Sequence, residues 1–329
     1  MNELSENALL QVEHLKKYFK VGKSSFLHAV DDVSFSLNKG ETLGVVGESG
    51  CGKTTLGRTL LRLQDATDGK IIFDGQDINK CSKAEMKKLR KDMQIIFQDP
   101  YSSLNPRMTI KEAIAEPLIV QKVLNSWNKD EIEKTVYDIM DRVGLSKRLI
   151  NSYPHELDGG RRQRIGVARA IVLKPKFIVC DEPVSALDVS IQAQVLNLMQ
   201  DLQKDMGLTY MFITHDLSVV KHLSTDIAVM YLGQLVEKAP AKELFRNPLH
   251  PYTNALLSAI PIPDPETSTK RILLKGELSS PIDPQPGCRF AKRCAYATEE
   301  CGKTDIPLKE IKKNHFVACN KIAKEYSET

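Results

Sequence analysis

The chain has 329 residues, 42% apolar and 27% charged, a composition that excludes collagen-like and intrinsically disordered proteins. Its net charge of +4 is too small to argue for nucleic-acid binding by itself. No stretch approaches the ~18 consecutive apolar residues of a membrane helix, and the polar segment 1–6 lacks the features of a signal peptide. We therefore expect a protein that is made and kept in the cytosol.

Short apolar runs alternate with helical patterns up to about residue 240. Alternating polarity in residues 1–40, 69–75 and 226–236 indicates antiparallel strands. Apolar runs predict buried strands at 42–46, 93–97, 177–180 and 210–214. The best helical pattern puts one apolar face on Ile191, Val195, Leu198 and Leu202. Strands separated by helices favour an α/β fold with a parallel core sheet and an antiparallel β-subdomain.

Proline marks a change in organisation, because nine of the 16 prolines lie between Pro240 and Pro286. Such a stretch is unsuited to long helices and central strands. We predict a large domain over residues 1–245 and an extension over residues 246–329. Within the extension we expect an irregular connector with one helix near residues 252–260, then a small cysteine-bearing module from residue 288. The alternative is a long extension wrapped on the main domain.

A phosphate-binding pattern, G-x-x-x-x-G-K-[ST], occurs as Gly47-Glu48-Ser49-Gly50-Cys51-Gly52-Lys53-Thr54. It follows a predicted strand and opens a helical pattern over residues 54–63, which is the context that the motif requires. Glycines let backbone N–H groups converge on phosphate oxygens, and the helix N-terminus adds partial positive charge. We predict that Lys53 reaches the β- and γ-phosphates, Thr54 binds Mg²⁺ and Thr55 contacts the α-phosphate.

Two further patterns suit nucleotide chemistry. The apolar run at residues 177–180 leads into Asp181-Glu182, where a P-loop ATPase places a carboxylate that holds Mg²⁺, usually through water. Glu182 is then placed to polarise the attacking water. Gly159 and Gly160 open an arginine-rich helix, whose N-terminus is suited to anions. In isolation, each pattern is also compatible with a solvated strand end or helix start.

Four more segments follow a familiar order. They are Ile96-Phe97-Gln98-Asp99-Pro100, Leu157-Asp158-Gly159-Gly160-Arg161, Ser185-Ala186-Leu187-Asp188 and Ile213-Thr214-His215-Asp216. With the P-loop, they make residues 8–240 resemble the ATPase subunit of an ABC transporter. The resemblance makes Gln98 the Q-loop, Asp188 the D-loop and His215 the switch histidine. It places residues 157–161 at the signature L-S-G-G-Q, and Phe19, with Tyr18 as second choice, at the aromatic position that stacks on adenine.

The resemblance implies an ABC-type P-loop fold with a helical subdomain near residues 101–154. It implies ATP hydrolysis with Glu182, His215 and Gln98 in catalysis, and with Mg²⁺ held by Thr54, Gln98 and Asp181. It also implies that ATP binds the P-loop with Phe19 on the adenine, and that each ATP lies between one subunit's P-loop and the other subunit's signature. Three other kinds of P-loop ATPase fit the sequence less well. A DNA-repair ATPase would carry a long insertion between the P-loop and the signature, and a translation factor would contain two cassettes in one chain. A metabolite kinase would lack the signature.

The extension resembles a narrower group. Asn247-Pro248-Leu249-His250-Pro251-Tyr252-Thr253, Gly287-Cys288 and Arg293-Cys294 are similar to the C-terminal extension of oligopeptide and dipeptide importer ATPases. This resemblance implies a peripheral protein on the cytoplasmic face of the cell membrane. Its implied partners are a second, different ATPase subunit, two membrane permeases and an external substrate-binding protein, and not nucleic acid. Related importers with this extension carry nickel or sugars, so the solute stays open.

Four of the seven cysteines crowd the last 42 residues, as Cys288, Cys294, Cys301 and Cys319. Thiols in a reducing compartment favour a metal over disulfides, but the spacing is not the C-x2-C of common zinc ribbons. The family resemblance favours a [4Fe–4S] cluster, which four thiolates suit. Zinc and free thiols remain alternatives. His315 is interpreted as a surface residue rather than a ligand.

The signature departs from the family pattern, since Asp158 replaces its serine and Arg161 its glutamine. An ionised Asp158 would repel a γ-phosphate by roughly 4 kcal/mol at about 4 Å and an effective dielectric near 20. Arg161 lies one helical turn on and is placed to neutralise it. We therefore predict two unequal ATP sites, the slower one formed by Asp158 and the partner's P-loop; a neutral double replacement is the alternative.

Overall fold

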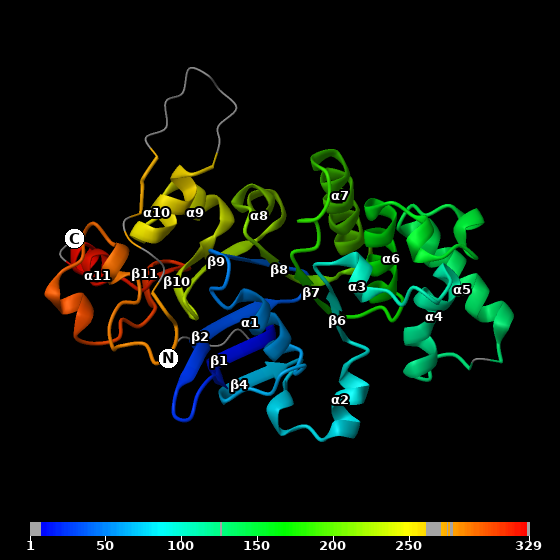
Figure 1. Ribbon diagram of the computed structural model, residues 1–329, viewed down its shortest axis with the longest axis horizontal. Helices are drawn as coiled ribbons and strands as arrows, with labels where there is room; N and C mark the ends of the chain where they lie inside the picture. The colour runs from blue at the N-terminus through cyan, green and yellow to red at the C-terminus, as the bar shows by residue number, and fades with distance from the viewer. Residues whose placement is uncertain (1–7, 126, 261–270, 275, 277–278, 328–329) are drawn as a thin grey trace, which may run out of the picture. The chain divides into compact units, whose positions relative to one another are not determined.

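A computed structural model describes residues 8–125, 127–260, 271–274, 276 and 279–327 (Figure 1). The predictions for residues 1–6 and for part of the connector fall outside these residues. Two compact units make up the chain. We call residues 1–37, 42–79 and 214–329 the P-loop unit, and residues 38–41 and 80–213 the signature unit. Within the described ranges, no helix is long and apolar enough to cross a membrane.

The P-loop unit holds most of the strands. They are β1 (Ala8–Lys20), β2 (Phe26–Asn38), β3 (Thr42–Val46), β4 (Asp68–Phe73), β5 (Gln76–Asp77), β9 (Asp226–Tyr231), β10 (Gln234–Pro240), β11 (Lys309–Lys312) and β12 (His315–Val317). Its α-helices are α1 (Lys53–Leu60), α8 (Leu217–Leu223), α9 (Ala241–Arg246), α10 (Pro251–Ser258) and α11 (Asn320–Ser327). Strands in the order β2-β1-β4-β5 form the predicted β-subdomain, with β4 antiparallel to both neighbours. Helix α1 contacts β1 beside this sheet (Figure 1).

The other strands of the P-loop unit run in the order β11-β12-β10-β9-β3. Strand β9 pairs parallel with β3 and antiparallel with β10. The residues of β9 after Asp226 are all buried. Residues 226–236 therefore do start an antiparallel hairpin, as predicted, but β9 belongs to the sheet of β3. A strand that is buried on both faces suits the interior of such a sheet.

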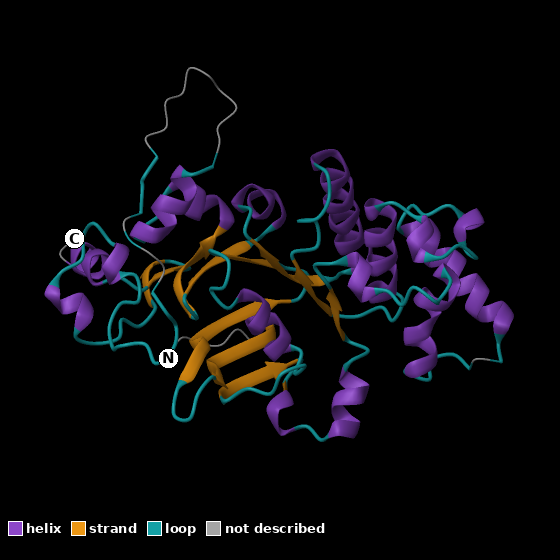
Figure 2. Cartoon of the chain, viewed as in Figure 1, coloured by secondary structure: helices purple, strands orange, loops and turns teal. Residues whose placement is uncertain are grey.

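The signature unit has its own parallel strands, β6 (Met93–Ile96), β7 (Phe177–Asp181) and β8 (Thr209–Thr214). Its α-helices, drawn in purple in Figure 2, are α2 (Lys83–Leu89), α3 (Pro100–Ser103), α4 (Ile110–Val120), α5 (Lys129–Arg142), α6 (Gly159–Ile171) and α7 (Val189–Met206). Helices α3, α4 and α5 form the predicted helical subdomain. On α7 the buried residues are Val195, Met199 and Leu202, so Met199 takes the place predicted for Leu198. The predicted α/β fold is confirmed, with a mixed rather than a purely parallel set of strands.

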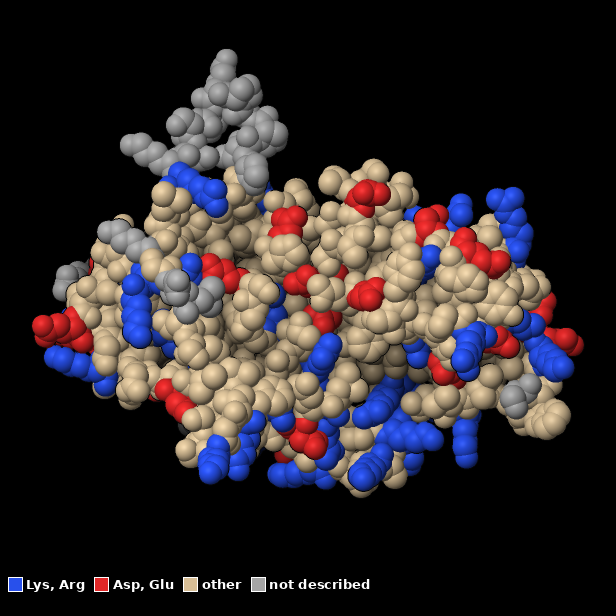
Figure 3. Space-filling model, in the orientation of Figure 1, with Lys and Arg blue, Asp and Glu red and all other residues tan. Residues whose placement is uncertain are grey.

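Acidic and basic side chains are mixed on the surface. On the face shown in Figure 3, acidic and basic side chains lie interspersed, and Lys and Arg gather over α2. That helix carries Lys87 and Lys88 in its last turn, where cations interact favourably with the helix dipole.

The C-terminal extension adds two strands to the P-loop unit. Strand β12 pairs with β10, at Glu237 opposite Val317 and Lys238 opposite Phe316. The interpretation of His315 as a surface residue is wrong, because its side chain is fully buried and its Nε2 lies 2.7 Å from Glu237 Oε1. Strand pairing carries this residue inward. The domain boundary at residue 245 stays a prediction.

Glu237 organises the start of the extension. Its buried carboxylate accepts the backbone N–H groups of Leu249 at 2.8 Å and His250 at 3.0 Å. His250 in turn caps α10, since its Nδ1 accepts the N–H of Tyr252 at 3.1 Å. Burial lowers the pKa of His250 to about 4, although the nearby Glu237 carboxylate acts in the opposite direction. His250 is therefore neutral in the folded chain at neutral pH.

Acidification is expected to destabilise the fold through His250. In the unfolded chain this imidazole binds a proton near pH 6.5, but in the folded chain only near pH 4. The unfolded state therefore binds more protons between these values, and the free energy of unfolding falls as the pH falls through this window. The slope from this group is at most about 1.4 kcal/mol per pH unit.

Thermal unfolding at pH 7 and pH 5 checks this expectation. His250→Asn keeps an N-cap acceptor without a titrating ring, so its melting temperature should depend less on pH than that of the wild type. Equal slopes for His250→Asn and the wild type would contradict the expectation.

Candidate functional site

The predicted P-loop lies between β3 and the N-terminus of α1, as the motif requires. Its turn demands glycine: Gly52 has φ of +105°, and an added Cβ would lie 2.0 Å from the carbonyl oxygen of Ala29. The Lys53 side chain is almost fully buried, and its Nζ donates to the carbonyl oxygens of Gly47 at 2.7 Å and Glu48 at 3.0 Å. The loop thus presents a buried cation at a helix N-terminus, an arrangement suited to phosphate.

Two residues of the C-terminal extension contact this loop. The backbone N–H of Glu48 donates to Tyr252 Oη at 2.9 Å. The Glu48 carboxylate accepts from Arg293 Nη1 at 2.7 Å and from Nη2 at 3.1 Å. The sequence does not reveal these partners, because they lie 204 and 245 residues from Glu48. The only signal was their place in short segments that resemble an importer extension.

The two adenine-stacking candidates have different surroundings. The Tyr18 ring stacks on His28 with centroids 3.8 Å apart, and its hydroxyl donates to Asp31. The ring of Phe19 lies 4.8 Å from Lys17 Nζ. Because His28 already stacks on the Tyr18 ring and Asp31 binds its hydroxyl, these contacts favour Phe19 as the residue that stacks on adenine. Its role stays a prediction.

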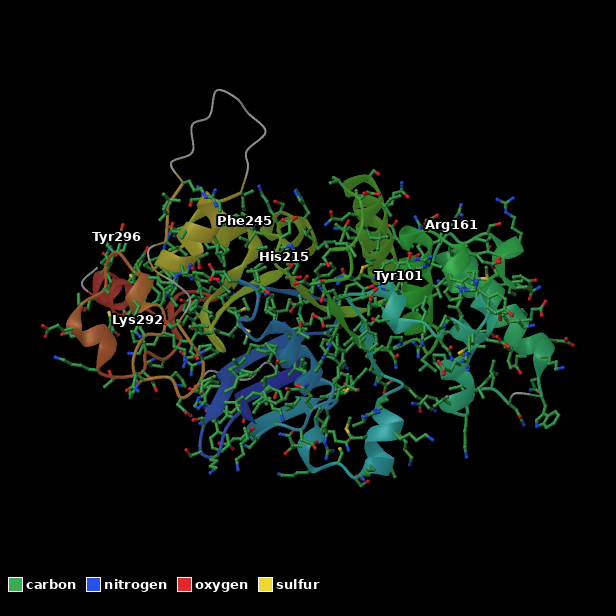
Figure 4. All side chains as sticks on the ribbon, in the orientation of Figure 1. Tyr101, Arg161, His215, Phe245, Lys292 and Tyr296 are labelled. Carbon is green, nitrogen blue, oxygen red and sulfur yellow. The ribbon has the colours of Figure 1, made fainter. Side chains whose placement is uncertain are left out.

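His215 lies on the loop that joins β8 to α8, and its side chain is exposed (Figure 4). The next residue, Asp216, fixes this loop. Its Oδ1 accepts the N–H of Ser218 at 2.8 Å as the N-cap of α8, and its N–H donates to Thr214 Oγ1 at 3.0 Å. These two hydrogen bonds fix the backbone next to His215, directly after the buried strand β8.

In the signature unit, the structure brings three predicted residues together at the end of β7. Asp181 is the last residue of that strand and is 2% exposed. Glu182 follows with φ of +47°, and its Oε2 accepts from Gln98 Nε2 at 3.0 Å. A non-glycine residue in the left-handed region costs conformational energy, which the hydrogen bond from the Glu182 N–H to Ile213 O at 2.9 Å helps to offset. Carboxylate and amide oxygens are the ligand types that Mg²⁺ prefers.

The altered signature forms the N-terminus of α6. Asp158 is its N-cap, and its Oδ1 accepts the N–H of Arg161 at 2.8 Å. The Arg161 Nε lies 3.4 Å from Asp158 Oδ2, with both side chains about half exposed (Figure 4 labels Arg161). The prediction that Arg161 reaches Asp158 across one turn is confirmed. The unequal activity of two ATP sites stays a prediction, as does the role of Asp188, the N-cap of α7.

The four cysteines of the extension lie in one neighbourhood. The Cys288 N–H donates to the Cys301 carbonyl at 2.7 Å. Burial and the nearby Cys301, Cys319 and Cys294 raise the pKa of Cys288 to about 11. Lys321, on the helix that follows Cys319, lies 3.9 Å from the ring centroid of Tyr296, two residues after Cys294. Among the described residues, however, no three His, Cys, Asp or Glu side chains are arranged to hold a metal ion.

Comparison with known proteins gives consistent results along the whole chain. Residues 30–185 match the family described as ABC transporter, and residues 236–301 match the oligopeptide/dipeptide transporter C-terminal region. The putative oligopeptide transport ATP-binding protein YkfD of Bacillus subtilis (strain 168) is 53% identical over 95% of this chain and 95% of its own length. Oligopeptide transport ATP-binding protein OppF of Escherichia coli (strain K12) is 51% identical over 98% of this chain and 99% of its own.

Solved structures show the same relationship. CbiO1 from Clostridium perfringens, part of the ABC transporter complex cbiONQ, aligns with a TM-score of 0.65 and 28% identity, covering 74% of this chain and 92% of that chain. The ATP-binding cassette MJ0796, in a dimeric post-hydrolysis state with ADP and Pi, aligns with a TM-score of 0.65 and 27% identity. It covers 70% of this chain and 98% of that chain.

Glu182→Gln is expected to bind ATP and to hydrolyse it at least about 100-fold more slowly, because an amide keeps the shape but does not accept a proton from water. Single-turnover hydrolysis of radiolabelled ATP, with ATP binding measured in parallel, checks this. Glu131→Gln, an equal change on the exposed face of α5, is the control and should behave as the wild type. A rate for Glu182→Gln within about twofold of the control would remove Glu182 from the reaction.

Proposed function

Because the chain belongs to the family of ABC transporter ATP-binding subunits, we propose that it hydrolyses ATP to drive import of oligopeptides or dipeptides across the cytoplasmic membrane. The ATPase core is common to many ABC transporters and does not specify the solute. The observation that carries the peptide assignment is the match of residues 236–301 to the oligopeptide/dipeptide transporter C-terminal region. Import of another solute, such as nickel or a sugar, by the same machinery is the alternative.

In the proposed mechanism, the P-loop N–H groups and Lys53 bind the phosphates of ATP. Mg²⁺, when bound, neutralises charge on the β- and γ-phosphates, and the hydroxyl of Thr54, the amide of Gln98 and the carboxylate of Asp181 are its proposed ligands. Gln98 orients Glu182 through their 3.0 Å hydrogen bond, and Glu182 accepts the proton of the attacking water. His215 contacts the γ-phosphate region.

We place the chain in an assembly with a second, different ATPase subunit, two membrane permeases and an external substrate-binding protein. In this assembly it lies on the cytoplasmic face of the membrane. Closure of the two ATPases sandwiches each ATP between one P-loop and the other subunit's signature. The change at Asp158 and Arg161 supports a pair of different subunits, because a partner with an unaltered signature would complete the site at this chain's own P-loop.

Uptake of labelled peptides by cells tests the proposed function. Cells that lack this chain are expected to lose uptake of short peptides, and the wild-type chain is expected to restore it, whereas Glu182→Gln is not. Uptake of nickel and of sugars, measured in the same cells, is the control. Loss of nickel or sugar uptake with intact peptide uptake would favour the alternative solute.

We also propose that the four cysteines bind a [4Fe–4S] cluster, which would serve as a structural or redox group. The clustering of Cys288, Cys294, Cys301 and Cys319 supports this assignment. Zinc requires several donors at about 2.3 Å from one point, whereas the thiolates of a cluster bind separate irons.

The full-length chain purified without oxygen is expected to be brown and to contain about four irons per chain with acid-labile sulfide. Replacing Cys319 by Ser should remove most of the iron, while Cys81→Ser, a buried cysteine outside the cluster, should not. One zinc per chain without sulfide would show that the site binds zinc instead. If neither iron nor zinc is found, the four cysteines are free thiols.

A further inference from the structure

Glu48, the second residue of the P-loop, has every polar group engaged. Its carbonyl oxygen accepts from Lys53 Nζ and from the Cys51 N–H within the loop, whereas the partners of its N–H and its carboxylate come from the C-terminal extension. The Tyr252 hydroxyl oxygen accepts a hydrogen bond from the Glu48 backbone N–H, and Arg293 donates two parallel hydrogen bonds to the Glu48 carboxylate. A bidentate pair of this type fixes both the position and the orientation of a carboxylate.

The two partners from the extension are themselves held rigidly. The Tyr252 ring is fully buried, 4.7 Å from the ring of Tyr231 and 5.4 Å from that of Phe290, centroid to centroid. The Arg293 side chain is 9% exposed, and its guanidinium lies 6.0 Å from the Tyr231 ring centroid. Fixed partners can hold a loop in one conformation, which flexible surface side chains do not do.

We propose that Arg293 and Tyr252 are positioning residues of the nucleotide site, which hold Glu48 and thereby set the affinity of the P-loop for ATP. The proposal rests on the ATPase activity and does not depend on which solute is transported. If Arg293 and Tyr252 act in this way, the C-terminal extension contributes to ATP binding at the P-loop of its own chain.

Charge explains why this loop needs Arg293. The P-loop surrounds phosphates, so an unpaired carboxylate at Glu48 would repel the triphosphate that the loop binds. Arginine stays protonated under all physiological conditions and matches a carboxylate with its fork of donors. Pairing therefore removes the repulsion and leaves the positive potential of Lys53 and of the α1 N-terminus to act on ATP.

Tyr252 acts on the backbone of the same residue. The N–H groups of a P-loop must point toward phosphate oxygens in a fixed pattern. Because the Glu48 N–H is directed at Tyr252 Oη, this peptide unit has one orientation before ATP arrives. Pre-organisation of this kind raises affinity by lowering the ordering cost of binding.

The test measures MgATP binding to the full-length chain by calorimetry. Arg293→Gln is expected to raise Kd about tenfold, the size of one lost charge-assisted interaction. Adding Glu48→Gln to this variant removes the unpaired charge and should restore much of the affinity, whereas damage to the fold would not be rescued. Arg293→Lys keeps the charge with a single donor group and should give an intermediate Kd. Tyr252→Phe should raise Kd by a smaller factor.

Lys292→Gln is the matched control, because it removes the same charge from the neighbouring, exposed residue and should leave Kd unchanged (Figure 4). A Kd for Arg293→Gln equal to that of Lys292→Gln would overturn the proposal. So would a loss of affinity that Glu48→Gln fails to rescue. If Arg293→Gln does not fold, a Kd of Arg293→Lys equal to the wild-type value would overturn it as well.

Discussion

The space around the P-loop is the constraint on which the rest of the P-loop unit depends. An added Cβ at Gly52 would lie 2.0 Å from a carbonyl oxygen at Ala29 on β2, and one at Gly47 would lie 2.1 Å from a carbonyl oxygen at Met230 on β9. One strand from each sheet, β2 and β9, therefore lies directly against the same turn. Strands β2 and β9 leave no room for a side chain at Gly47 or Gly52, so the turn fits between these strands only with glycine at both positions.

Local patterns predicted the parts of the site that are local in the chain. Strand β3, the glycine turn and Lys53 follow one another within about a dozen residues, so an apolar run and a short motif suffice to find them. The same holds for β7 and Asp181. The pairing of Arg161 with Asp158 was also predicted, because one helical turn fixes which side chains meet.

Contacts between residues far apart in the chain could not be predicted from the sequence, because they depend on how distant elements pack together. His315 has no sequence feature that tells a buried partner of Glu237 from a surface histidine, and only the pairing of β12 with β10 carries it inward. The bonds of Tyr252 and Arg293 to Glu48 likewise depend on how the extension packs. Hydrophobic periodicity reports which face of an element is buried, but not which distant element buries it.

The pairing of β12 with β10 has a consequence for how the chain is made. Glu237 leaves the ribosome long before His315, the buried residue that its carboxylate contacts, 78 positions later. Domains generally fold from the N-terminus during synthesis, but here the β9–β10 hairpin keeps an exposed strand edge until β12 has been made. The P-loop unit is therefore complete only after β12 has been made, and a fragment that stalls before β12 keeps the exposed strand edge that chaperones and proteases act on.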